Sequence, residues 1–235
     1  MLIITPIALA LLTSAHAQEL DTTLAYTAWG TFAAGSALTL VYEPESPNFP
    51  TSTAPAFDAQ IRSYFARDEP LGEFESIASY AIFPWMAAPF ALQVLNGDNT
   101  TELTNTLNSY LFTLGLTQLV KSSVARERPD GSDNLSFFSG HSAGAFVAGA
   151  GVASALQRSG ASPWLSHTAW LASGVLAFSR VVDDKHFASD VITGAAIGAA
   201  AGIYYQRHGV TDSTTSLHFS SSEQLPLAIA FSGDL

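Results

Sequence analysis

The chain has 235 residues, of which 48% are apolar and only 12% are charged, and its formal net charge is −11. A chain of this length can form one domain with a substantial buried core. So acidic a chain lacks the basic surface that nucleic-acid binding requires, which argues against a nucleic-acid partner. It contains no cysteine, and this excludes disulfides, thiolate metal sites and a cysteine nucleophile.

Residues 1–17 resemble a secretory signal peptide. A mostly apolar run is followed by Ala15-His16-Ala17, which has the small-x-small pattern of a cleavage site. Neither Lys nor Arg precedes the run, although signal peptides usually begin with positive charge. We expect this segment to be removed on export, residues 18–209 to form one helical domain, and residues 210–235 to form a tail.

Seven apolar or amphipathic stretches predict helices, and turn residues separate them. The second stretch is short, and its apolar face is expected to consist of Phe57, Ile61 and Phe65. The other six are expected to form the core of an all-α bundle, and two prolines should break or bend the third stretch. The expected helices cover residues 23–41, 56–67, 77–94, 102–124, 139–156, 164–179 and 186–206.

Two patterns near the end of the chain concern packing. Gly194, Gly198 and Gly202 recur at four-residue intervals, which places a glycine stripe on one face of the last expected helix. A neighbouring helix can approach such a stripe closely. Beyond Gly209 the sequence changes character, and apolar residues alternate with others between positions 217 and 231. This alternation predicts a possible short β-hairpin in the tail.

The positive charge of this acidic chain is concentrated in a few places. Five of its nine Lys and Arg residues fall in two short segments, 121–129 and 179–190. An acidic protein that gathers its cations in this way is expected to bind an anion there. The five cations are Lys121, Arg126, Arg128, Arg180 and Lys185.

The same region carries groups suited to phosphate chemistry. Asp190 lies four residues after His186, so its carboxylate can accept from Nδ1 of the ring and leave the Nε2 lone pair exposed. Ser139 and Gly140 precede an expected helix start, where backbone N–H groups favour an anion, and His141 follows at once. Each feature alone is more often a surface pair or a turn, but their combination indicates a phosphate site.

Three motifs at conforming intervals resemble the pattern of the type 2 phosphatidic acid phosphatase family. That family shares its fold with bacterial non-specific acid phosphatases and vanadium haloperoxidases. The resemblance implies an active site at the ends of the third to sixth long helices. In the first motif, six residues separate Lys121 from Arg128-Pro129, and the second is Ser139-Gly140-His141. In the third, five residues separate Ser179-Arg180 from His186, and three more separate His186 from Asp190.

The resemblance implies a role for each motif residue. His186 would attack phosphorus through Nε2 and form a phosphohistidine, with Asp190 orienting the ring. His141 would protonate the leaving oxygen and then activate the water that hydrolyses the intermediate. Neither a metal nor another cofactor is implied by this set of groups. The remaining motif residues would hold the phosphate oxygens in the transition state: Lys121, Arg128, Ser139, Gly140 and Arg180.

The middle motif departs from the family pattern, because Phe138 stands where a proline usually precedes the serine. This change removes no catalytic group, so we expect a less preorganised loop rather than an inactive site. Two alternatives stay open: a vanadate-dependent haloperoxidase, and a non-catalytic envelope protein with a degenerate anion site. Arg126 and Lys185 occupy variable positions of the motifs, and we expect both at the rim of the site.

The expected function is a metal-independent phosphatase that acts on phosphate monoesters or pyrophosphates, either a lipid phosphate or a small ester. The signal-like segment favours a periplasmic protein of the cell envelope, soluble or in contact with the membrane. An integral membrane protein with its site facing the periplasm is the alternative, because the charged fraction is so low. The expected helices 139–156 and 164–179 are shorter than the roughly 20 apolar residues that a span requires.

Overall fold

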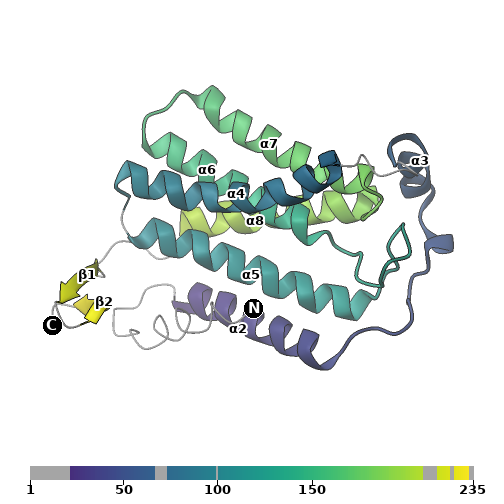
Figure 1. Ribbon diagram of the computed structural model, residues 1–235, viewed down its shortest axis with the longest axis horizontal. Helices are drawn as coiled ribbons and strands as arrows, with labels where there is room; N and C mark the ends of the chain where they lie inside the picture. The colour runs from purple at the N-terminus through teal and green to yellow at the C-terminus, as the bar shows by residue number, and fades with distance from the viewer. Residues whose placement is uncertain (1–21, 67–72, 99, 209–215, 223–224, 233–235) are drawn as a thin grey trace.

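The computed structural model describes residues 22–66, 73–98, 100–208, 216–222 and 225–232 (Figure 1). In this part of the chain seven α-helices form the domain, which confirms the all-α prediction. The expected signal peptide lies outside the described residues. The helices are α2 (Thr22–Val41), α3 (Ala56–Phe65), α4 (Glu73–Asn96), α5 (Thr100–Val124), α6 (Gly140–Arg158), α7 (Pro163–Val182) and α8 (Ala188–His208), with a short 3-10 helix, Thr51–Thr53, before α3.

Most expected helices end within a few residues of the observed ones, but α8 begins later than expected. It begins at Ala188, so His186 lies in the turn before the helix rather than on it. The end of α7 holds this turn, because the His186 amide donates to the Arg180 carbonyl at 3.1 Å. We expected a break or a bend at Pro84 and Pro89; the helix is not broken there, because α4 continues through both prolines.

The bundle is built around α6, which packs against α4, α7 and α8, while α2 lies along α5 (Figure 1). The glycine stripe of α8 allows the closest of these contacts. A side-chain carbon at Gly194 would collide with the Ser139 carbonyl, and one at Gly198 would collide with the Ala143 backbone. The close packing that the stripe predicts is therefore confirmed. It also holds the start of α8 against the start of α6, where the second motif lies.

Replacing Gly198 by alanine is expected to destabilise the fold, because the new methyl group would overlap the Ala143 backbone. Overpacking of this kind lowers the free energy of unfolding by about 1–3 kcal/mol. Gly174 in α7 is a matched control, since nothing lies within 4 Å of a carbon added there. Gly174→Ala should raise the free energy of unfolding by about 0.5–1 kcal/mol. Urea unfolding measures both values, and equal values for the two variants would contradict the close contact.

The tail after α8 contains two strands, β1 (Ser216–Ser222) and β2 (Leu225–Ser232), which pair antiparallel. They occupy the segment in which the alternation of apolar residues predicted a hairpin. The backbone register pairs Leu217 with Phe231 and Phe219 with Ile229, and it is irregular between positions 220 and 222.

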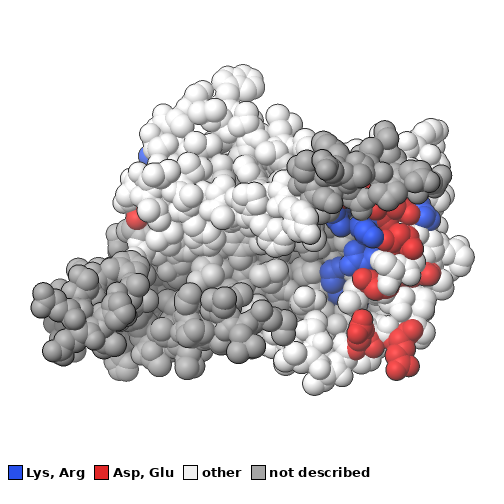
Figure 2. Space-filling model, in the orientation of Figure 1, with Lys and Arg blue, Asp and Glu red and all other residues white. Residues whose placement is uncertain are grey.

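Charged side chains gather at one end of the bundle. Figure 2 shows most of the Lys, Arg, Asp and Glu side chains of this face at the end where α3 lies, whereas the described surface over the middle of the bundle carries almost none. At this end α5 and α7 finish while α6 and α8 begin (Figure 1). Exposed apolar side chains include Leu40, Leu95, Trp164 and Leu171. Within the described ranges, no helix combines the length and the apolar character that crossing a bilayer requires.

Candidate active site

The three motifs come together at the charged end of the bundle. Lys121 lies in the last turn of α5, Ser139 is the residue before α6, and Arg180 lies in the last turn of α7. His186 precedes α8, and Asp190 lies in the first turn of that helix. The Ser139 amide donates to the Asp190 carbonyl at 3.1 Å, which links the second motif to the third. The fold thus brings the predicted site residues to one place.

His186 is 3% exposed, and groups on either side orient its ring. On one side, Arg128 Nη1 lies 3.3 Å from Nε2. A guanidinium can only donate, so Nε2 of the neutral ring must accept and the proton must reside on Nδ1. On the other side, Nδ1 lies 3.5 Å from Ser136 Oγ and 3.7 Å from Asp190 Oδ2. The resulting tautomer directs the Nε2 lone pair toward the cations, which is the form that a nucleophile needs.

Asp190 is fully buried and surrounded by donors. Its Oδ2 accepts from Ser136 Oγ at 2.5 Å and from the Phe187 amide at 2.9 Å, and its Oδ1 accepts from Arg126 Nη1 at 2.6 Å. Burial by itself would raise the pKa of this carboxyl group, but the interactions with His186, Ser136 and Arg126 outweigh burial and lower the pKa. Asp190 is therefore an anion whose orientation is determined by contacts on both oxygens.

Two arginines of the site are positioned by carboxylates. Arg128 Nε donates to Asp133 Oδ1 at 2.7 Å, and Arg180 Nη1 donates to Asp183 Oδ2 at 2.9 Å. Arg180 is only 7% exposed, whereas the Arg128 side chain is 17% exposed. Guanidinium groups held in this way suit the bidentate recognition of phosphate oxygens.

Lys121 is a buried cation whose pKa is strongly shifted. It is 8% exposed and donates to the Leu135 carbonyl. Burial and the neighbouring Arg128 charge lower the pKa of its ammonium group to about 7. A bound anion would favour the charged form of Lys121, so the site would become more positive when phosphate binds.

His141, the second residue of α6, lies in the field of the same cations. Burial, together with the charges of Arg180, Lys121 and Arg128, lowers the pKa of His141 to about 4. Burial also lowers the pKa of His186 to about 3, although the neighbouring carboxylate acts in the opposite direction. Both rings are therefore neutral at neutral pH in the ligand-free protein. A phosphate dianion would offset the cations and raise both pKa values.

The stability of the ligand-free protein is expected to fall as the pH drops below about 6.5. Unfolded histidines take up protons near that pH, whereas the folded His141 and His186 do so only near 4 and 3. The unfolded state then binds more protons, which lowers the free energy of unfolding by on the order of a few kcal/mol. Urea unfolding at about pH 7 and about pH 4.5 measures this loss. In a double variant, His141→Asn/His186→Asn, the free energy of unfolding should fall less between these two pH values. An identical fall would show that the two histidines do not cause the pH dependence.

The start of α6 offers backbone donors to an anion. Ser139 caps the helix, because its Oγ accepts from the Ser142 amide at 3.3 Å. Gly140 begins the helix, and a side-chain carbon there would crowd Thr117 of α5. Helix starts of this kind attract phosphate through their N–H groups and dipole. Phe138 is 1% exposed, so packing anchors the loop at the position where the family pattern has a proline.

The prediction that Arg126 lies at the rim is wrong. Arg126 is 9% exposed, because Asp58 accepts from its Nη2 at 2.8 Å while Asp190 accepts from its Nη1. Lys185 does lie at the surface, where its side chain is 35% exposed and pairs with Asp130 at 2.6 Å. The motif pattern describes spacing along the chain, and it carries no information on the carboxylate that α3 contributes to Arg126.

Sequence reasoning also missed Asp58 and Ser136, which belong to no motif. Asp58 is completely buried on α3, whereas Phe57 and Phe65, expected on the buried face, are 51% and 45% exposed. The helix was predicted correctly, but only part of its expected face is buried: Ile61 packs against the core cluster of Ala177, Val181 and Val191. The one sequence signal for a buried carboxylate was Asp58 itself, an acidic residue beside the apolar positions of a short helix. This signal is weak, because a carboxylate at the solvent-exposed surface gives the same pattern.

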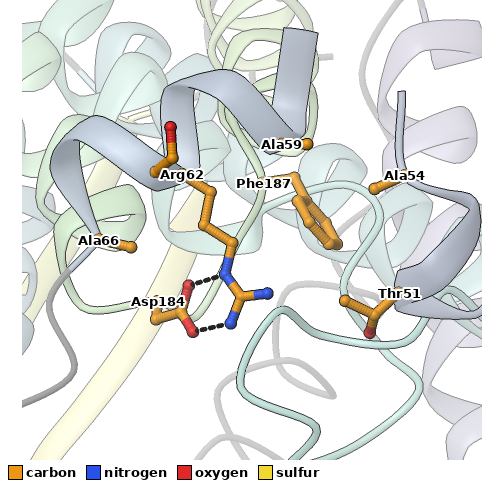
Figure 3. A pocket seen from close by; sticks show the side chains of 8 residues that line it. Thr51, Ala54, Ala59, Arg62, Ala66, Asp184 and Phe187 are labelled. Atoms are coloured by element: carbon orange, nitrogen blue, oxygen red, sulfur yellow. Dashed lines mark hydrogen bonds and ion pairs between the residues drawn. The ribbon is translucent and has the colours of Figure 1, made fainter. Parts of the chain in front are cut away.

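A cavity of about 410 Å³ lies next to the His186 turn, between α3 and the end of α7 (Figure 3). Arg62 of α3 donates to Asp184 through Nε at 2.7 Å and through Nη2 at 2.6 Å. Phe187 lines the wall across from this pair (Figure 3). Asp184 has a φ of 52°, the left-handed conformation common where a helix ends. Among the described residues, no three potential metal-ligating side chains lie together.

Known proteins resemble part of this chain. A sequence profile of the PAP2 superfamily matches residues 102–212. The chain belongs to this superfamily. A lipid A 1-phosphatase of Porphyromonas gingivalis is 38% identical over 88 residues, which are 37% of this chain and 19% of that protein. The chain therefore matches about a fifth of the length of that relative.

The fold is shared with a solved structure. The crystal structure of Aquifex aeolicus LpxE matches with a TM-score of 0.52 and 18% sequence identity, and the match covers 65% of this chain and 96% of that one. At this level of identity the likeness concerns the fold. The PAP2 superfamily segment includes α5 to α8, the four helices that carry the motifs, and it begins after α3 and α4.

Proposed function

We propose that this PAP2 superfamily protein is a phosphatase that hydrolyses phosphate monoesters or pyrophosphates through a phosphohistidine, without a metal. The observation that carries the proposal is the orientation of His186. Arg128 on Nε2, with Ser136 and Asp190 near Nδ1, selects the tautomer whose lone pair faces the cations. Membership of a superfamily of phosphatases supports the same activity.

In the proposed reaction, a phosphate oxygen replaces Nε2 as the acceptor for Arg128, while Lys121 and Arg180 bind the other oxygens. The Nε2 lone pair of His186 then attacks phosphorus, so that a P–N bond forms as the bond to the leaving oxygen breaks. Asp190 stabilises the positive charge that develops on the ring. Ser139 and the Gly140 amide at the start of α6 complete the set of donors to the phosphate oxygens.

His141 supplies the proton for the leaving oxygen in this scheme. The ring must be protonated at that step, and a bound phosphate dianion favours this by raising its pKa. The neutral ring then takes a proton from water, whose oxygen attacks the phosphohistidine. The P–N bond breaks, inorganic phosphate leaves, and both His141 and His186 return to their initial protonation states.

A lipid phosphate is the substrate class that we favour. The P. gingivalis relative is a lipid A 1-phosphatase by name, and this chain exposes apolar side chains such as Trp164 and Leu171. Residues 1–17 resemble an export signal, which would place the mature domain in the cell envelope, either soluble or associated with the membrane. N-terminal sequencing of the protein from the envelope should begin at Gln18, and an intact Met1 there would refute cleavage.

The activity is tested with the purified full chain, p-nitrophenyl phosphate and phosphatidic acid in the presence of a chelator. Turnover of at least one of the two esters is expected to persist in chelator. Calorimetric titration with inorganic phosphate shows independently whether the anion site is intact. A folded, phosphate-binding protein that hydrolyses no phosphate ester would refute the proposal and favour a non-catalytic anion-binding protein.

A further inference from the structure

α3 is tied to the His186 turn at two points. Asp58, in the first turn of α3, is fully buried and accepts from the Ser189 amide at 2.8 Å and from Ser189 Oγ at 2.6 Å. Arg62, one turn later, donates twice to Asp184 (Figure 3). The two partners lie on either side of His186 in the sequence, so α3 holds both ends of the segment that carries this residue.

Arg126 connects Asp58 to Asp190. Its Nη2 donates to Asp58 Oδ2 at 2.8 Å, and its Nη1 donates to Asp190 Oδ1 at 2.6 Å and to Ser189 Oγ at 2.8 Å. The guanidinium also lies over the Phe187 ring, with 4.2 Å between Cζ and the ring centroid. A planar guanidinium can bridge two carboxylates in a fixed geometry. The orientation of Arg126 therefore depends on Asp58 as well as on Asp190.

Asp190 transmits this constraint to the ring of His186. Its Oδ2 accepts from Ser136 Oγ and lies 3.7 Å from Nδ1 of the ring. Rotation of the Asp190 carboxylate would move away the acceptor that favours a proton on Nδ1. Arg126, bonded to the other oxygen at 2.6 Å, opposes this rotation. Hydrogen bonds thus run from α3 through Arg126 to Asp190 and Ser136, and these two side chains lie 3.7 and 3.5 Å from Nδ1 of the proposed nucleophile.

We propose that Asp58 and Arg126 are positioning residues for His186, and that α3 belongs to the active site although it lies outside the matched superfamily segment, residues 102–212. The kinetic consequences rest on the proposed phosphatase function, but the ring tautomer can be measured without turnover. Loss of either residue leaves the phosphate-binding cations in place and misdirects Nε2. Such a defect lowers kcat and leaves KM almost unchanged.

Asp58→Asn is the most informative variant, because it preserves the side-chain volume but presents an amide donor to Arg126. In the full chain, kcat on p-nitrophenyl phosphate should fall about 10- to 100-fold with KM within about twofold of the native value. Arg126→Lys should behave similarly, since an ammonium lacks the planar fork that bridges two carboxylates. Arg158→Gln is the matched control, because Arg158 pairs with Asp98 at the opposite end of α6. The kcat of this variant should equal that of the native protein.

Two further measurements separate positioning from a loss of folded protein. Calorimetric titration with inorganic phosphate counts the intact sites, so kcat is expressed per phosphate-binding site. Long-range ¹H–¹⁵N NMR of the His186 ring, assigned with His186→Asn, reports the tautomer directly. The native ring should carry its proton on Nδ1 alone, and the ring in Asp58→Asn should be a mixture of both tautomers.

The inference would be overturned if Asp58→Asn had the native kcat per phosphate-binding site and the single native tautomer of His186. It would also be overturned if kcat per total protein fell but kcat per phosphate-binding site stayed at the native value. If the native chain hydrolyses no ester, the proposed function fails, and the tautomer alone decides: a mixture in the variant supports positioning, and an unchanged ring overturns it.

Ser189→Ala replaces Asp58→Asn if the latter does not fold. It removes only the hydroxyl that donates to Asp58 and accepts from Arg126. Because hydrogen bonds rather than a charge are lost, kcat per site should fall about three- to tenfold. A Ser189→Ala variant with native kcat and the native His186 tautomer would overturn the inference in this case.

Discussion

Replacing His186 by alanine is expected to lower kcat on a phosphate monoester by at least about 10⁴-fold, because the variant lacks the proposed nucleophile. Binding of inorganic phosphate should persist, since Lys121, Arg128 and Arg180 remain. Arg128 Nη1, which lies 3.3 Å from Nε2 in the native protein, becomes available to the anion when the ring is removed. Steady-state kinetics with p-nitrophenyl phosphate and calorimetric titration with phosphate measure the two effects separately.

His141→Ala is the matched control within the site. The p-nitrophenolate group leaves without needing a proton, so formation of the phosphohistidine should depend little on His141, whereas its hydrolysis still needs a base. Phosphorylated His186 should therefore accumulate in this variant and be detected by intact-protein mass spectrometry. Native-like turnover by His186→Ala would show that another group attacks phosphorus, and the proposed mechanism would then be wrong.

Replacing Arg126 by methionine is expected to lower the free energy of unfolding by about 3–5 kcal/mol at neutral pH. Methionine fills most of the volume of arginine but leaves Asp58 and Asp190 buried without their shared cation. Both carboxylates are fully buried, so neither can be solvated in place of the lost contacts. Urea unfolding measures the effect, and circular dichroism beforehand shows whether the variant is folded.

Arg158→Met provides the control for this second variant. The side chains of the Arg158–Asp98 pair are 30% and 10% exposed, and loss of such a pair costs less than about 1 kcal/mol. An equally small loss for Arg126→Met would contradict the buried bridge. Such a result would instead support the original prediction that Arg126 lies at the rim of the site.

The helices and the motif residues could be predicted because their signals are local. Apolar periodicity and turn residues along the chain mark approximately where each helix begins and ends, and the motifs place His141 in the first turn of α6 and His186 just before α8. The glycine stripe of α8 also predicted close packing correctly, since a missing side chain has the same consequence whichever helix approaches.

The buried face of α3 could not be predicted in this way. Phe57 and Phe65 suggested an apolar contact, yet the structure exposes both and buries Asp58 between donors from Ser189 and Arg126. In a short helix, the contacts offered by the rest of the fold determine which face is buried. Those donors come from segments far along the chain, and apolar periodicity contains no information about them.

By itself, the sequence identified the groups that we propose bind and cut phosphate: a set of cations, a serine and glycine at a helix start, and two histidines in a PAP2 superfamily segment. The tertiary structure decided how these groups are oriented. Arg126 and Asp58 lie 68 positions apart in the chain, and Arg128 contacts a histidine from another motif. A tautomer or a buried ion pair depends on which atoms surround it, and only folding brings these distant segments into contact.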